Sequence, residues 1–442
     1  MMLQILKKHK YNLSLLLVAI FATSGAAIQT EKKLSDEEYD KYILGRSFFT
    51  IPWVEAPSAT TARDGLGPLF NANTCNSCHP KATRGTLYTN EGNLSRSVIP
   101  KLSITSNNSK EHKDLIYTNG LVPEPTYGAQ IAINGVHGVK YEAKPEIKFE
   151  EIKFVFPDGE EQILLKPKYM LTNLQYGELH KDTDLTFRLA PSLFGVGLLD
   201  DIKEEDILAN EDEFDKDKDN ISGKANIVYS PITGKYELGR FSWKASHTTL
   251  KHQIANAAIN DMGLTTTIYP TDICSDKQEA CINAPKARDQ IDLPDLRLNA
   301  IEFFLQNQKI QKPKIDEEFE KGLALFKQIG CVKCHKDSFT TNSGIKIAPF
   351  TDLLLHDMGE GLADGRGEFK AQGKEWRTPP LWNLTLSEKV GGNKLRLLHD
   401  GRARTFQEAI LWHGGEAQGV KENYINLNKK DRETILRFLE EV

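Results

Sequence analysis

The pattern Cys-x-x-Cys-His occurs twice in this chain, as Cys75-Asn-Ser-Cys78-His79 and as Cys331-Val-Lys-Cys334-His335. This spacing is the attachment signature of c-type haem. Each thiol adds to one vinyl group on the same porphyrin edge, and the adjoining imidazole then lies under the iron as an axial ligand. A zinc site would need two more ligands at similar spacing, and none lies close to the second copy. The alternative is a structural or redox-active cysteine pair. We expect two covalently bound haem c groups.

Helical patterns flank the second copy. Apolar residues recur every three to four positions between Asp316 and Gly330, which predicts one amphipathic helix that ends at the glycine. A second capped amphipathic pattern covers residues 428–442. A helix that leads into the motif and a terminal helix that crosses it resemble a cytochrome c domain. We place this domain at residues 315–442.

The region around the first copy predicts a larger haem domain at residues 34–308. Helices are expected at about 248–261 and 293–305. Between about 98 and 175, short β-type runs alternate with glycine turns, which indicates a β-rich insertion; the runs are 130–133, 147–149, 152–156 and 162–165. The expected fold class is mainly α, with two cytochrome c-like haem domains.

The first 27 residues predict a secretory signal peptide. Lys7, Lys8 and Lys10 precede an apolar run that is too short to span a bilayer comfortably, and small residues follow near Ala26. An uncleaved anchor is the alternative. Export to the periplasm agrees with haem c, and cleavage would leave no stable membrane span. The net charge of −5 and the lack of a basic stripe argue against a nucleic-acid partner.

Two further features lie outside the Cys-x-x-Cys-His copies. Cys274 and Cys281 are expected to pair as a disulfide in an oxidising compartment. Asp215, Asp217 and Asp219 alternate in an acidic loop, as carboxylate ligands of calcium do. The loop lacks the turn glycine and the final glutamate of an EF-hand, so a solvated acidic turn is the alternative.

Four longer segments resemble the di-haem oxidoreductase family. They are 62–72 before the first haem motif, 188–199, 376–382 and 398–417. The likeness covers nearly the whole mature chain. The family is related to bacterial di-haem cytochrome c peroxidases and to the di-haem enzyme that matures a tryptophylquinone cofactor. The resemblance implies electron transfer between two haems, and it implies a homodimer because related enzymes are often dimers.

The resemblance implies a sixth ligand for the second haem iron. In the peroxidases, the segment after His-Asp-Gly ends in a methionine ligand, and His413 stands at that position here. Imidazole in place of a thioether would lower the reduction potential. The alternative is that His413 caps a helix or bonds a propionate. His399 and Met358 are the other candidates for this ligand.

The resemblance also implies residues around the first haem. The peroxidases place a tryptophan between the haems and a glutamine ten residues later in the distal pocket, and Trp243 and Gln253 match them. Trp243 as an ordinary core residue is the alternative. The distal acid, ten residues further on, is replaced by Gly263, whereas Asp261 lies two residues earlier.

This departure bears directly on the chemistry, because peroxide cleavage needs a group that moves a proton between the two oxygens. Asp261, His247 or His252 are the candidates. The expected function is therefore a peroxidase-like oxidoreductase. Electrons would come from a small redox protein or a quinone-linked donor, pass from the C-terminal haem to the N-terminal haem, and reduce a small-molecule oxidant there.

Two other functions stay open at this point. A non-catalytic electron carrier would have both irons six-coordinate, with His247, His252 or Met262 closing the first haem. A haem-based binding or sensor protein would bind a ligand without turnover.

Overall fold

The structure is a computed structural model that describes residues 34–288, 290–390, 392 and 394–442. The expected signal peptide at 1–27 lies outside the described residues. Among the helices of the described part, none is long and apolar enough to cross a membrane.

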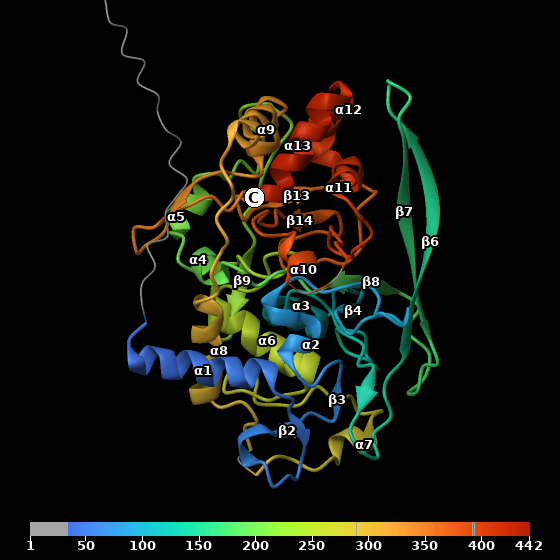
Figure 1. Cartoon of the computed structure of the whole chain (residues 1–442). Helices are drawn as coiled ribbons and strands as arrows, with labels where there is room; N and C mark the ends of the chain where they lie inside the picture. Colours follow the sequence, from blue (N-terminus) through green and yellow to red (C-terminus); the bar gives the residue numbers. More distant parts are fainter. Residues whose placement is uncertain (1–33, 289, 391, 393) are drawn as a thin grey trace, which may run out of the picture.

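Three helices frame the first half. Helix α1 (Asp36–Thr50) lies against α8 (Asp295–Gln306), which also packs on α6 (Leu250–Met262) (Figure 1). The close approach of α1 requires Gly45, because a Cβ there would lie 1.9 Å from the carbonyl oxygen of Ala300. The predicted helices near 248–261 and 293–305 are confirmed.

Helix α9 (Glu317–Gln328) leads into the second haem motif, and α13 (Lys429–Glu441) packs across it. Gly322 permits this contact, because a Cβ there would lie 2.5 Å from the Cβ of Phe438. The Phe438 ring meets Phe319 and Phe326 at centroid distances of 5.1 and 5.2 Å. Both helices predicted in this part of the sequence are confirmed.

The other helical elements are short. They are α2 (Cys75–Cys78), α3 (Lys110–Asn119), α4 (Val196–Asp200), α5 (Glu204–Leu208), α7 (Glu279–Ile282), α10 (Leu386–Lys389), α11 (Phe406–Trp412), α12 (Gln418–Ile425), and the 3-10 turns η1 (Thr61–Arg63), η2 (Pro80–Ala82), η3 (Cys331–Lys333) and η4 (Gly415–Ala417).

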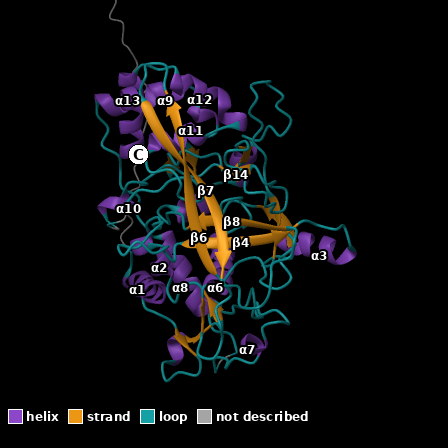
Figure 2. Ribbon diagram, turned by 90° about the vertical axis from the view of Figure 1, so that its right-hand side faces the viewer, coloured by secondary structure: helices purple, strands orange, loops and turns teal. Residues whose placement is uncertain are grey.

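A long two-stranded ribbon runs along one side of the molecule (Figures 1 and 2). Its antiparallel strands are β6 (Lys144–Val155) and β7 (Glu161–Thr172), and β7 contacts α11. At the turn between the strands, Arg432 of α13 donates to Asp158 and Glu160 at 2.6 and 2.9 Å. These ion pairs fasten the ribbon to the C-terminal half.

The remaining strands form small pairs around the centre. The antiparallel pairs are β4 (Val98–Ile104) with β8 (Thr183–Leu189), β3 (Leu69–Phe70) with β5 (Asn134–Gly135), β9 (Ile227–Ser230) with β10 (Lys235–Leu238), β11 (Phe339–Thr340) with β12 (Lys346–Ile347), and β13 (Leu355–Asp357) with β14 (Glu375–Arg377); β1 (Val54–Glu55) and β2 (Asp64–Leu66) pair in parallel.

The expectation of a mainly α fold is wrong. Of the described residues, 31% are helical and 20% are in strands, and these strands form two-stranded sheets. Most of these strands have two to four residues, too few for a repeating pattern to reveal them. The predicted run 130–133 is not a strand either, because only Gln130 pairs, in an isolated bridge to Lys101.

The main hydrophobic core draws on both halves of the chain. It includes Phe49, Trp53 and Leu298 of the first half, and Phe326 and Phe438 of the second. The expected disulfide between Cys274 and Cys281 is confirmed. The domain boundaries at 34–308 and 315–442 stay predictions.

Candidate functional site

Each Cys-x-x-Cys-His motif occupies a single turn. The first forms α2, which Thr74 caps by accepting a hydrogen bond from the Ser77 amide at 2.9 Å. The second forms η3, which follows Gly330 in the left-handed region at φ 100°. The four cysteines of the motifs are free thiols. One turn therefore presents two thiols and a histidine together at each place.

The two motif histidines are held in the same way. Nδ1 of His79 lies 2.7 Å from the carbonyl oxygen of Pro191, and Nδ1 of His335 lies 2.8 Å from that of Phe350. Because Nδ1 donates to a carbonyl, the lone pair of each ring is on Nε2, the nitrogen that can bind iron. Burial lowers the pKa of both histidines to about 4, so both rings are neutral at pH 7.

His413 is held in the same tautomer. It follows α11, and its Nδ1 lies 2.7 Å from the carbonyl oxygen of Ala409, which leaves Nε2 as the acceptor. Burial lowers the pKa of His413, and its ring in turn helps to lower that of His335. The structure thus brings His413 and His335 to the same cavity.

The other candidates for this ligand differ in their contacts. His399 stacks on Trp376 with a centroid distance of 3.8 Å and an interplanar angle of 11°. Met358 also lines the cavity and directly follows β13. The Trp376 stack already occupies one face of the His399 ring.

One continuous cavity of about 1010 Å³ connects the two motifs. Ligand pockets typically measure about 300–1,000 Å³, so this one suits a large cofactor. Both cysteines and the histidine of each motif line it, together with Trp243.

Three arginines of the cavity each keep one N–H group without a partner among the described residues, although their terminal nitrogens are paired. Arg188, Arg240 and Arg366 line it, and the Nε of each is buried without a hydrogen-bond partner in the described part of the chain. Guanidinium N–H groups are preferred partners of carboxylates, and haem carries two propionates. Free thiols, Nε2 lone pairs and these three free Nε–H groups together fit two haem groups.

Comparison with known families agrees with this geometry. The model of the family described as "Di-haem oxidoreductase, putative peroxidase" matches residues 18–442. The chain belongs to the di-haem oxidoreductase family. Haem is therefore its cofactor class, as the two motifs and the cavity require.

No curated protein matches this di-haem oxidoreductase. One solved structure with local likeness is the Kuenenia stuttgartiensis hydrazine synthase pressurised with xenon, at 18% identity and a TM-score of 0.23. The alignment covers 34% of this chain and 55% of the hydrazine synthase chain. The chain thus spans about half the length of that structure.

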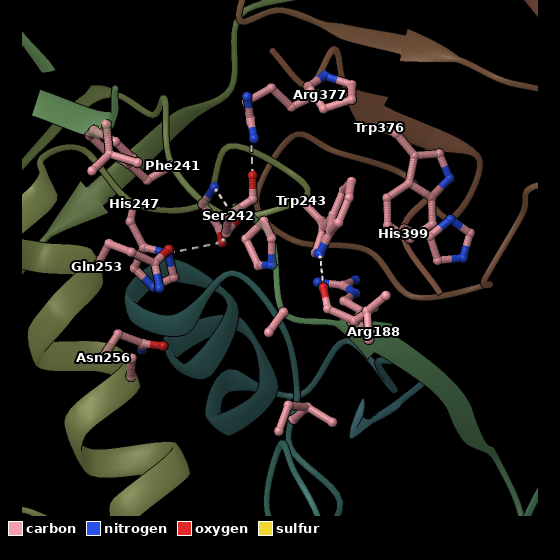
Figure 3. A pocket seen from close by; sticks show the side chains of 18 of the residues that line it. Arg188, Phe241, Ser242, Trp243, His247, Gln253, Asn256, Trp376, Arg377 and His399 are labelled. Atoms are coloured by element: carbon pink, nitrogen blue, oxygen red, sulfur yellow. Dashed lines mark hydrogen bonds between the residues drawn. The ribbon is translucent and has the colours of Figure 1, made fainter. Parts of the chain in front are cut away.

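Trp243 and Gln253, the family-matched positions, both line the cavity of this di-haem oxidoreductase. Trp243 is buried, and its Nε1 donates to the carbonyl oxygen of Leu189 at 3.0 Å. Figure 3 shows Trp243 between two groups of side chains: His247, Gln253 and Asn256 on one side, and Trp376 with His399 on the other. The Oε1 atom of Gln253 is buried and has no partner among the described residues.

No side chain fits at Gly263, the position at which the resemblance to the peroxidases implies an acid. It ends α6 with φ at +63°, and a Cβ there would lie 2.6 Å from the Cα of Gly67 and 2.8 Å from the carbonyl oxygen of Leu69. A side chain at this position would therefore be strained and would clash with backbone. The packing of α6 on β3 excludes a glutamate here.

Asp261 faces the cysteines. Its Oδ1 accepts from Gln130 at 2.8 Å. Burial raises the pKa of the Cys75 and Cys78 thiols, and the Asp261 charge adds to this effect. Burial raises the pKa of Asp261 itself, although the Lys101 ammonium opposes this. Asp261 therefore interacts with Gln130, Lys101 and the two cysteines of the first haem motif.

His247 belongs to a hydrogen-bonded chain that the sequence did not reveal. Its Nδ1 lies 3.4 Å from Oγ of Ser246, and Ser246 in turn bonds Glu368. Although burial opposes it, Arg188 and Arg366 hold the pKa of Glu368 well below its ordinary value. Glu368 thus keeps a buried negative charge that reaches His247 through one hydroxyl.

His252 is engaged at both nitrogens. Nδ1 lies 3.3 Å from the amide of Thr248, and Nε2 lies 2.9 Å from the hydroxyl of Tyr269. Its ring meets His247 edge to face at 4.7 Å. The Met262 sulfur lies 3.9 Å from the Cys75 thiol. All three residues proposed to close the first haem, His247, His252 and Met262, line the cavity.

We expect the buried His252 to lower the free energy of unfolding as the pH falls from 7 to 5. Burial lowers its pKa from 6.5 to about 2, so at pH 5 the unfolded chain binds a proton at this site and the folded chain does not. Between pH 7 and pH 5 this histidine should therefore reduce the free energy of unfolding by about 2 kcal/mol. Urea unfolding at the two pH values measures it. In the matched variant His252→Gln the loss should be smaller by that amount, and an equal loss would contradict the assignment.

The acidic loop is joined to the second motif. The Asp219 amide donates to the carboxylates of Asp215 and Asp217 at 2.9 and 3.2 Å. Its own carboxylate pairs with Lys333, inside the motif, at 2.9 Å. The carboxylates of Asp215 and Asp217 instead lie within 4.8 Å of Asp212. Calcium in this loop stays a prediction that a calcium titration of the purified protein would test.

A buried ion triple adjoins Cys334. Nε2 of His356 lies 2.8 Å from Asp352, and its Nδ1 lies 2.7 Å from Glu416. Although burial opposes it, the Asp352 carboxylate raises the pKa of His356 well above its ordinary value. Glu416 also accepts from Ser222 of the acidic loop at 2.6 Å. No local sequence pattern predicts this triple, because Glu416 lies in a segment far along the chain from Asp352 and His356.

Proposed function

We propose that this di-haem oxidoreductase is an exported c-type enzyme that reduces hydrogen peroxide or a similar small oxidant at its first haem. Electrons would enter at the second haem and cross by way of Trp243. The observation that carries the proposal is the single cavity lined by both motifs and by Trp243. A shared cavity supports direct electron exchange between its two ends.

Covalent attachment at both motifs is part of the proposal. The four free thiols, in pairs on single turns, support it. Haem c is attached outside the cytoplasm, so the predicted signal peptide and a periplasmic location belong to the same proposal. The donor would be a small redox protein or a quinone-linked carrier. A homodimer stays a prediction.

The second site is proposed to hold and deliver electrons. His335 and His413 would both hold its iron, since each has a neutral ring with Nε2 as the acceptor. Two imidazoles leave no open position for an oxidant. The site would therefore take up electrons without reacting with peroxide itself.

The first site is proposed to react with the oxidant. His79 would ligate the iron on one side. When bound, the haem supplies the redox chemistry of peroxide reduction, and the protein supplies proton transfer and access. Overall, hydrogen peroxide, two electrons and two protons give two waters.

His247 is proposed to move the proton at the first site. A neutral imidazole takes a proton from one peroxide oxygen and returns it to the other, so that the second oxygen leaves as water. Burial lowers the pKa of His247 to about 4, so the ring is a free base at pH 7. Gln253 and Asn256 lie beside it and offer amide groups to a bound oxidant (Figure 3). His247 thus replaces the carboxylate that Gly263 cannot provide.

Electron paramagnetic resonance of the purified holo-protein tests the proposal. We expect a low-spin second haem in the oxidised state and a high-spin first haem in the oxidised or the half-reduced state. The half-reduced protein should then consume hydrogen peroxide. If no high-spin ferric signal appears in either state and peroxide does not react, the proposal is wrong.

Mass spectrometry tests the cofactor content independently. Mature protein from a host that attaches haem c should carry two haem groups. One haem or none would contradict the covalent part of the proposal while leaving the family assignment intact.

A further inference from the structure

Three tyrosines and a phenylalanine form an aromatic cluster near the cavity. Tyr117 lies in α3, Tyr229 in β9 and Tyr236 in β10. The Tyr117 ring lies 5.0 Å from Tyr236 and 5.7 Å from Tyr229, centroid to centroid. Tyr236 also lies 6.3 Å from Phe369. All four rings are within the range of direct aromatic contact.

The cluster reaches from the cavity to solvent. Tyr229 and Phe369 line the cavity. Tyr117 and Tyr236 are 55% and 40% exposed. Helix α3, which carries Tyr117, projects from the body of the molecule (Figure 2). A series of touching rings therefore leads from the interior to the surface.

The local structure holds these rings in place. Tyr229 and Tyr236 are directly opposite each other in the β9–β10 pair. The Tyr236 hydroxyl donates to the carbonyl oxygen of Tyr117 at 2.7 Å. The amide of Phe369 donates to Gly120, the residue that ends α3, at 2.9 Å. Three separate segments thus fix one aromatic group.

Neighbouring residues connect the cluster to His247. Phe369 directly follows Glu368, which bonds Ser246 and acts on His247. The amide of Lys370, the next residue, donates to Asn226, just before β9. Tyr229 and Phe369 therefore line the same cavity as His247, at which the oxidant is proposed to react.

We propose that Tyr229, Tyr236 and Tyr117 form an electron path by which bulky phenols at the surface reduce the oxidised first site. The inference rests on the proposed function and adds a second class of electron donor. A tyrosine in contact with the cavity gives up one electron and its phenolic proton, and the next ring restores both. At the surface, the phenol ArOH supplies the electron and proton and becomes the radical ArO•.

The complete reaction balances. One hydrogen peroxide and two ArOH give two waters and two ArO•, so the oxygen–oxygen bond and two phenolic O–H bonds break and four water O–H bonds are present at the end. The phenol never enters the cavity. The substrate class is therefore phenols too large to reach the haem, including phenols on polymers or on other proteins.

A phenol grafted to dextran provides the probe, because the polymer cannot enter the cavity. The main variant is Tyr117→Phe, which keeps the ring, and the second is Tyr236→Phe. Tyr39→Phe is the matched control, because Tyr39 is 56% exposed on α1, outside the cluster. We expect each cluster variant to oxidise tyramine-dextran at no more than about one tenth of the wild-type rate. The control should keep the wild-type rate.

Two further readouts separate this inference from the proposed function. Peroxide consumption with ferrocyanide as the small donor should be the same in all variants. Freeze-quenched wild type with peroxide should show a tyrosyl radical signal, which the cluster variants lose and Tyr39→Phe keeps. If wild type consumes peroxide but the variants match it with tyramine-dextran, the path is wrong and the proposed function stands. If wild type consumes no peroxide with any donor, both are wrong.

Discussion

The variant His413→Met should raise the reduction potential of the second haem. His413 has a buried neutral ring whose Nδ1 bonds the carbonyl of Ala409, so only Nε2 is available to the iron. A thioether stabilises ferrous haem more than an imidazole does. Axial ligands tune haem potentials over about 0.8 V, and we expect a rise on the order of 0.1–0.3 V. A spectroscopic redox titration measures it.

The variant His413→Ala provides the complementary test. Removal of the sixth ligand should convert the second haem from low-spin to high-spin. His399→Ala is the control and should keep the low-spin signal, because His399 is stacked on Trp376. If the His399 variant becomes high-spin and the His413 variant does not, His399 is the ligand and our assignment is wrong.

Local patterns in the sequence were sufficient for the parts of this site that depend on neighbouring residues. The thiol pair and histidine of each motif share one turn, and short spacing alone predicts that. The helices on either side of Cys331 were equally readable, because their apolar stripes and capping residues lie within a few turns. The disulfide between Cys274 and Cys281 joins residues seven apart.

Contacts between distant segments were not readable. The chain from Glu368 through Ser246 to His247 joins two segments on opposite sides of the second motif, and no spacing rule relates them. The aromatic cluster of Tyr117, Tyr229 and Tyr236 likewise depends on the way α3 meets the β9–β10 pair. The prediction of a mainly α fold is wrong for the same reason. Paired strands of two or three residues form only where separate segments meet, and no local pattern marks them.

The structure explains why this chain has a glycine at position 263, where the peroxidases have an acid. The resemblance to the peroxidases implies an acid at the position where this chain has Gly263. The structure adds that Gly67 and Leu69 leave no room for any side chain there. The absence of the acid is therefore part of the packing between α6 and β3, and the proton-transfer group must lie elsewhere in the cavity.

The variant His247→Ala should slow the reaction of the first haem with hydrogen peroxide by about 10²–10⁴-fold, the usual contribution of a positioned base. The ring is neutral because burial lowers its pKa to about 4. Its protonated form cannot accept a proton, so the wild-type rate should hold above pH 5 and fall as the pH drops through about 4. Stopped-flow mixing of half-reduced protein with peroxide measures both effects.

Two companion variants make the result specific to proton transfer. His247→Gln keeps a polar side chain of similar length but cannot act as a base, so it should be as slow as the alanine variant. His247→Glu restores a group that can carry a proton and should recover part of the rate. A merely structural role for His247 would predict the opposite order, with glutamine the better replacement.

The same variants decide between an enzyme and an electron carrier. In a carrier, His247 would ligate the first iron through Nε2, and wild type would be low-spin at both haems. His247→Ala would then create a high-spin haem and make peroxide react faster. The sign of the rate change therefore separates the two functions, because an open iron needs His247 as a base whereas a closed iron reacts only after His247 is lost.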